Sequence, residues 1–79
     1  MSLRPQVAAD LRRHGIEPEP GDEPARLRER LNDAYLEDVR RLRERQRSGA
    51  IPLAEYAAHV EALRGLYPAL SLPLELWGE

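Results

Sequence analysis

A long helical stripe followed by a very short link constrains this chain more than any other feature. Between about Glu23 and Ser48, apolar residues recur at three- and four-residue spacing, which is the pattern of an amphipathic helix. At 1.5 Å per residue this helix would be about 38 Å long. The link Gly49–Ile51 is too short for anything but a helical hairpin, so we expect the next helix to return antiparallel. The stripe consists of Leu27, Leu31, Ala34, Tyr35, Val39 and Leu42.

Prolines and glycines divide the rest of the chain. Gly15 ends a first short helix, Pro52 occupies the first turn of a third helix, and Pro68 stops it. The sequence therefore predicts an all-α protein with one small domain over residues 1–79. Its predicted parts are a helix at 3–14, an acidic proline-rich linker at 15–22, a helix at 23–48, a helix at 52–66 and a tail at 67–79.

The tail has a pattern of its own. Leu70, Leu72, Leu74 and Leu76 fall on every second position, with Trp77 beside the last of them, and a period of two indicates an extended segment. A short helical turn between residues 71 and 78 is the alternative. Three places for the tail remain open: the groove between the second and third helices, a second copy of the chain, or a different protein.

Apolar surface in excess of what one copy can bury predicts association. The two short helices are each long enough to cover only about half of the long one, and small domains with thin cores gain stability by oligomerising. Asp38 falls inside the apolar stripe, where it either reaches an arginine along the helix or fixes the register of an assembly. The expected interface residues are Leu31, Tyr35, Asp38, Val39, Leu42, Leu70, Leu72, Leu74, Leu76 and Trp77.

These features favour a small non-enzymatic assembly or adaptor protein that acts through protein–protein contacts, with itself as a homodimer or higher oligomer, or with another protein. The alternative function is nucleic-acid binding through a cluster of arginines near the end of the long helix. That cluster spreads around the helix, no aromatic residue interleaves with it for base stacking, and the net charge is −2. Its members are Arg40, Arg41, Arg43, Arg45 and Arg47.

The residues that carry chemistry are few. The chain has no Cys, and its two histidines, His14 and His59, have no further metal ligands at a short spacing. No glycine-rich phosphate loop or nucleophile motif is present. We therefore expect no enzymatic activity, no cofactor and no metal. The sequence contains no apolar run of membrane-spanning length, so we expect a soluble cytoplasmic protein without membrane contacts.

Residues 42–63 resemble the short helical hairpins called SHOCT modules. Those modules have a leucine-bearing helix, a glycine-x-isoleucine turn, a glutamate–aromatic pair and a closing leucine. The resemblance covers less than a third of the chain and implies a helical hairpin that serves in oligomerisation. The matching positions are Leu42, Gly49, Ile51, Glu55, Tyr56 and Leu63.

Overall fold

The computed structural model describes residues 2–78, so Met1 and Glu79, the two ends of the predicted domain, lie outside the described residues. Three helices are present: α1 (Pro5–Arg13), α2 (Pro24–Arg47) and α3 (Leu53–Arg64). Two short 3₁₀ turns follow, η1 (Pro68–Ser71) and η2 (Leu74–Leu76). Within residues 2–78 the β contact found is an isolated bridge between Leu3 and Gly78. The predicted all-α class is confirmed.

Local sequence signals set the ends of the helices. α1 and α2 each begin with a proline. Proline has no N–H, and this costs nothing in the first turn of a helix, where N–H groups have no acceptor within the helix. After each of these helices the chain turns through a glycine with positive φ, 78° at Gly15 and 87° at Gly49. A side chain strains this backbone region, so glycine allows the sharp exits that lead into the two connections.

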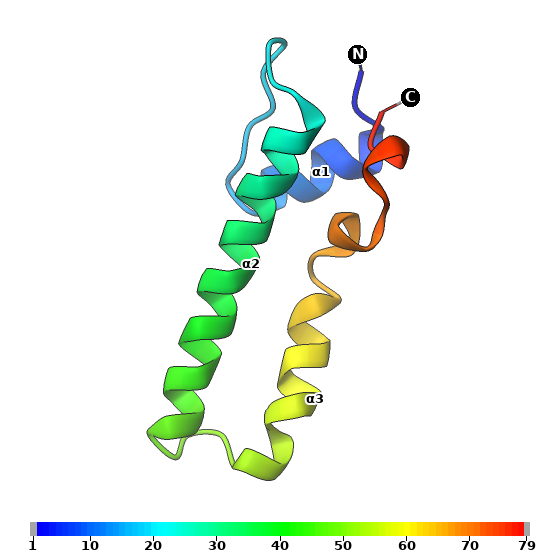
Figure 1. Cartoon of the computed structure of the whole chain (residues 1–79). Coiled ribbons are helices and arrows are strands. Elements are labelled where there is room, and N and C mark those ends of the chain that lie inside the picture. The colour runs from blue at the N-terminus through cyan, green and yellow to red at the C-terminus, as the bar shows by residue number, and fades with distance from the viewer. Residues whose placement is uncertain (1, 79) are drawn as a thin grey trace.

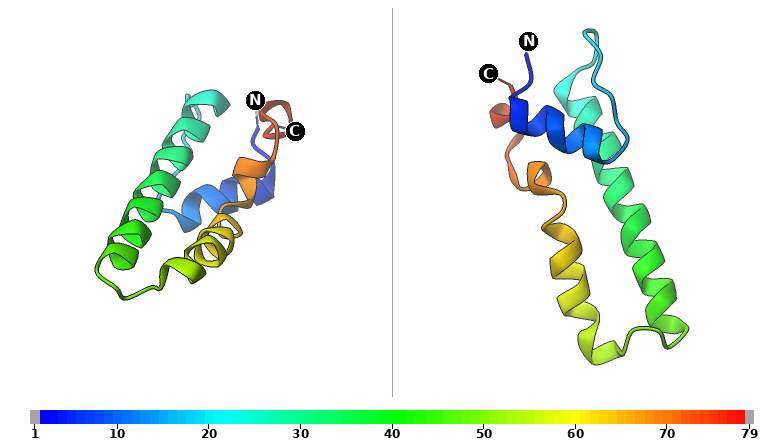
Figure 2. Two further views of the ribbon diagram at one scale, coloured as in Figure 1. Left: turned by 60° about the horizontal axis from the view of Figure 1, so that its bottom comes forward. Right: turned by 180° about the vertical axis from the view of Figure 1, so that it is seen from behind.

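α2 is the spine of the molecule. In Figure 1, α3 runs back beside the C-terminal half of α2, while α1 crosses the N-terminal half together with the C-terminal turns. The same arrangement is visible from behind in Figure 2, where the segment before α1 lies next to the segment after η2. We call residues 2–31 with 67–78 the head, and residues 32–66 the arm.

The hydrophobic core lies in the head. It joins residues from α1, the following linker, the first half of α2, and the C-terminal turns, and six of its eight members are at most 1% exposed. The arm contains only two buried residues, Leu42 at 8% and Ile51 at 2% exposure. The core residues of the head are Val7, Leu11, Ile16, Leu27, Leu31, Tyr67, Ala69 and Trp77.

The tail is not the extended segment that its alternating leucines predict. It forms η1 and η2, with extended backbone only at Leu72 and Pro73 between them. Pro68 and Pro73 lack an N–H and fix φ. Residues 2–78 contain no strand that could pair with the tail, so its backbone groups bond locally instead. The N–H groups of Leu72 and Leu76 donate to carbonyls three residues earlier, at 3.1 and 2.9 Å. The correct alternative is the helical turn, as 3₁₀ rather than α-helix.

The tail also packs within its own chain, against α1 and the N-terminal half of α2 rather than in the groove between α2 and α3. Trp77 is fully buried there, and its indole N–H donates to the Ala69 carbonyl at 3.1 Å. Arg28 of α2 donates to the carbonyls of Leu72 at 2.6 Å and Leu70 at 3.1 Å. These bonds satisfy carbonyl groups that the short 3₁₀ turns leave open, and they fix the tail across α2.

Candidate interaction surface

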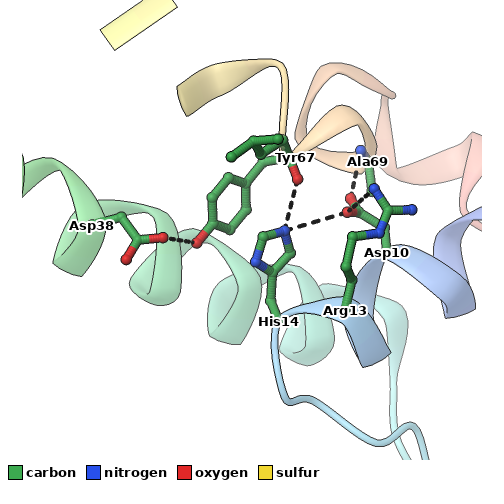
Figure 3. A network of polar contacts seen from close by, with 7 residues as sticks. Asp10, Arg13, His14, Asp38, Tyr67 and Ala69 are labelled. Carbon is green, nitrogen blue, oxygen red and sulfur yellow. Dashed lines mark hydrogen bonds and ion pairs between the residues drawn. The ribbon is translucent and has the colours of Figure 1, made fainter. Parts of the chain in front are cut away.

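A chain of polar side chains crosses the junction between the head and the arm (Figure 3). The Tyr67 hydroxyl donates a short hydrogen bond to Asp38 of α2. The Tyr67 ring stacks on the His14 imidazole, with ring centroids 3.7 Å apart, and meets Tyr35 edge-on at 5.4 Å. Burial, the hydrogen bond to Asp38 and the negative charge of Asp38 together raise the pKa of Tyr67 above its usual value.

The second half of this network surrounds a buried carboxylate. Asp10 is fully buried, and its Oδ2 accepts the backbone N–H of Ala69 at 2.9 Å. Its Oδ1 lies 3.5 Å from Nε2 of His14 and 3.9 Å from a guanidinium nitrogen of Arg13. The same Nε2 lies 2.7 Å from the Leu66 carbonyl. Since a carbonyl oxygen can only accept, Nε2 carries the hydrogen.

This network holds α1, α2 and the C-terminal turns together. Within residues 2–78 the buried Asp10 Oδ1 has no hydrogen-bond partner, and its charge is faced by His14 and Arg13 at ion-pair distance. Asp10 was not predicted from the sequence, where His14 was considered only as a metal-ligand candidate without further ligands at a short spacing. A signal was present: Asp10 falls between Val7 and His14 at helical spacing, so α1 places a carboxylate in its apolar stripe, as α2 does with Asp38.

The structure separates the ten predicted interface residues into three groups. Leu42 is 8% exposed and lines the groove between α2 and α3. Leu31 and Trp77 are completely buried in the head, so these two belong to the chain's own interior rather than to an open surface. The prediction was therefore wrong for Leu31 and Trp77. It was made from the apolar pattern, which does not show which side chains the tail and α1 cover. Leu74 and Leu76 are each 37% exposed. The half-buried members are Tyr35, Asp38, Val39, Leu70 and Leu72.

A shallow groove runs along the arm between α2 and α3, with a volume of about 610 Å³. Its floor is apolar and its rim carries charged or titratable groups from both helices. Asp38 lies at the end of the groove near the head. Arg45 lies at the opposite end, near the Gly49–Ile51 link, which we call the tip of the arm. We call the apolar lining residues the floor and the charged or titratable ones the rim. The floor consists of Leu42, Ala62, Leu63 and Leu66, and the rim of Asp38, Arg41, Arg45 and His59.

α3 has the composition of a buried helix but none of its residues is buried. Leu53 at its start is 73% exposed, and Leu66 just after its end is 55% exposed. Helices that are apolar around most of their circumference are ordinarily covered on more than one side. Within α3 the apolar residues are Leu53, Ala54, Tyr56, Ala57, Ala58, Val60, Ala62 and Leu63.

All five arginines of the predicted nucleic-acid cluster are exposed, but most have carboxylate partners. Arg40 pairs with Glu37 at 2.9 Å, Arg41 with Asp38 at 3.2 Å, and Arg47 with Glu44 at 3.9 Å. Among residues 2–78, Arg43 and Arg45 form no ion pair, and only Arg41 and Arg45 line the groove.

Residues 2–78 hold no group of three or more His, Asp or Glu side chains placed to bind a metal ion. None of the helices in that range has both the length and the apolar character needed to cross a membrane.

Comparison of the chain with protein-family models, with curated proteins and with solved structures finds no match. The resemblance of residues 42–63 to SHOCT modules therefore stays a prediction, and the assignment of a function depends on the geometry of the arm.

Proposed function

We propose that this chain is a small non-enzymatic assembly protein, which acts through protein–protein contacts made by the groove side of its arm. The observation that carries the proposal is α3, an apolar helix with no buried residue. Apolar side chains that stay in water cost free energy, about 25 cal/mol for each Å² left exposed. A contiguous exposed apolar surface is typical of an interaction site.

The dimensions of the molecule support the same conclusion. A compact domain of this length has a radius of gyration of about 12 Å, whereas this chain has 14.4 Å and measures 45 × 17 × 16 Å. A monomer of 9.0 kDa is expected to expose about 4,900 Å², and this one exposes 5481 Å². The excess of about 600 Å² approaches the roughly 800 Å² that each partner buries in a standard interface.

Protein is favoured over nucleic acid as the partner because of the charge distribution. Three of the five clustered arginines are already paired with carboxylates one turn away, and the net charge of the chain is −2. Both facts reduce the attraction of a phosphate backbone. A second copy of the chain is the simplest partner, since its groove offers the same apolar floor.

Two leucine substitutions test the proposal. Leu66 lies on the groove and Leu36 lies on α2 outside it, and they are 55% and 49% exposed. We expect sedimentation equilibrium at micromolar concentration to give a dimer for the wild type and for Leu36→Glu. Leu66→Glu places a charge on the apolar floor, so we expect it to give a folded monomer with unchanged helicity.

The matched pair decides the outcome. A wild-type chain that sediments as a monomer across the micromolar range would overturn self-assembly. A dimer that is disrupted by Leu36→Glu and not by Leu66→Glu would place the interface on another face of the molecule.

A further inference from the structure

The groove of the arm changes charge along its length. Asp38, Leu42 and Arg45 follow one another at spacings of four and three, so they share one side of α2, with Asp38 and Arg45 about 10 Å apart along the helix axis. Leu42 lies between them, level with the middle of the groove. The groove thus has an acid, Asp38, at one end and a base, Arg45, at the other. If a second copy of the groove faces it in the opposite direction, each acid meets a base.

We infer that the partner is a second copy placed antiparallel, about a two-fold axis that crosses the groove at the level of Leu42 and Ala62. This inference rests on the proposed function. The rotation lays α2 against α2 and α3 against α3 of the partner subunit. Arg45 of each copy then faces Asp38 of the partner subunit, and Ala62 lies close to the axis.

Both charged groups have capacity for such a contact. Arg45 forms no ion pair with any other residue in the range 2–78, so its guanidinium donors are open. The Asp38 side chain is 32% exposed, with Oδ2 accepting from Tyr67 and Oδ1 from Arg41. A carboxylate has about four lone-pair sites, so Asp38 can accept a further guanidinium.

If the two arms lay parallel, the same end of each groove would meet. The arginine-rich ends of α2 in the two copies would then lie side by side, and the charges would not be complementary. A two-fold contact also requires one self-complementary patch, which this groove supplies. Exposed ion pairs contribute little to affinity. The apolar floor therefore supplies the binding free energy, and the charges select the antiparallel orientation.

Small residues on α3 allow the helices to approach. Ala62 lines the groove and also a second hollow on α3, together with Ala58, Glu55 and His59. Alanine at these positions leaves space for the same helix of a partner subunit, so α3 can sit close to α3 across the axis.

Single cysteines test the position of the axis, because the wild-type chain contains none. We expect Ala62→Cys to be linked to itself in high yield by a short bis-maleimide reagent, since the two sites meet at the axis. Ala54→Cys is the matched control: it lies outside both hollows, and we expect it to stay unlinked.

Charge substitutions test the orientation. Arg45→Glu would place one acid opposite Asp38 at each of the two symmetry-related contacts, and we expect it to raise the dimer Kd about tenfold or more. Adding Asp38→Asn removes that repulsion and keeps an acceptor for Tyr67, so we expect partial recovery. Arg43→Glu, a second arginine without an ion pair, lies outside the groove and should leave the Kd unchanged.

The outcomes separate this inference from the proposed function. A dimer in which Ala62→Cys does not link, or in which Arg45→Glu equals Arg43→Glu, overturns the antiparallel register and leaves the assembly function standing. A chain that is monomeric without any substitution overturns both.

Discussion

At the scale of single residues, Tyr67 joins the two parts of the molecule. Its ring packs between His14 of the head and Tyr35 of α2, and its hydroxyl reaches Asp38 at the start of the groove. Because the hydroxyl donates to Asp38, that carboxylate is held at the rim of the groove in one orientation. The core of the head thus positions a charge that we assign to the interaction surface.

Alkaline unfolding offers a clear test of Tyr67. Its pKa is higher in the folded chain than the value of about 10 in an unfolded one. Between these two values the folded state holds a proton that the unfolded state has lost, so the free energy of unfolding falls as pH rises above about 10. Below that pH both states are protonated and this group adds no pH dependence. We expect urea unfolding monitored by circular dichroism to show this decline.

Tyr67→Phe is the control for that experiment. It keeps the ring and removes the ionisable group, so we expect a lower stability at neutral pH, by about 1 kcal/mol for the lost hydrogen bond, and a flatter profile above pH ~10. The chain has no Lys, so no lysine titration overlaps this range. An equally steep decline in the variant would mean that another group controls alkaline unfolding.

At the scale of elements, the tail depends more on Trp77 than on Leu76. Trp77 is 0% exposed, whereas Leu76 is 37% exposed. We expect Trp77→Ala to lower the free energy of unfolding by about 3–5 kcal/mol, a large share of the stability of a small domain. Leu76→Ala should cost about 1 kcal/mol or less, since much of its side chain stays in water.

Chemical denaturation followed by circular dichroism measures both changes without needing the tryptophan as a probe. Equal losses for the two substitutions would show that the tail packs differently from the arrangement described here.

The helices could be predicted from the sequence because their signals are local. Proline at the first turn and glycine after the last one fix an end whatever the rest of the chain does, as at Pro24 and Gly49. The tail could not be predicted in this way. An alternation of leucines indicates a strand only if partners exist for its backbone, and the prolines at 68 and 73 together with the carbonyls held by Arg28 favour turns.

The candidate surface was predictable only in part, for a related reason. The stripe of α2 identified apolar side chains, but nothing local distinguishes Leu31, which the head buries, from Val39, which stays partly exposed. Asp38 was singled out by its place in the stripe, whereas its bond to Tyr67 required the tertiary arrangement.

At the scale of the whole molecule, the head and the arm differ in how they are stabilised. The head has a core of eight residues, and the arm buries only Leu42 and Ile51. Segments with few buried apolar contacts open locally at low free-energy cost. A partner on the groove would supply the contacts that the arm lacks.

Hydrogen exchange should therefore depend on protein concentration in one half of the chain only. We expect the amides of α3 to exchange more slowly as concentration rises through the dimer Kd, because binding stabilises the closed arm. The amides of α1 and of η1 should show little change. Mass spectrometry of peptides from each region measures both, and a uniform response along the chain would contradict this division.

The pairing of the two chain ends has a consequence for how the molecule can be rebuilt. Leu3 and Gly78 form a bridge, the N–H of Arg4 donates to the Trp77 carbonyl at 2.9 Å, and this pairing lies at the end of the molecule opposite the Gly49–Ile51 link. A few added residues could close the backbone into a ring without moving either end, and the exposed Gly49 turn is where such a ring could be reopened. Cargo attached to either end would be carried at the same pole, well away from the groove.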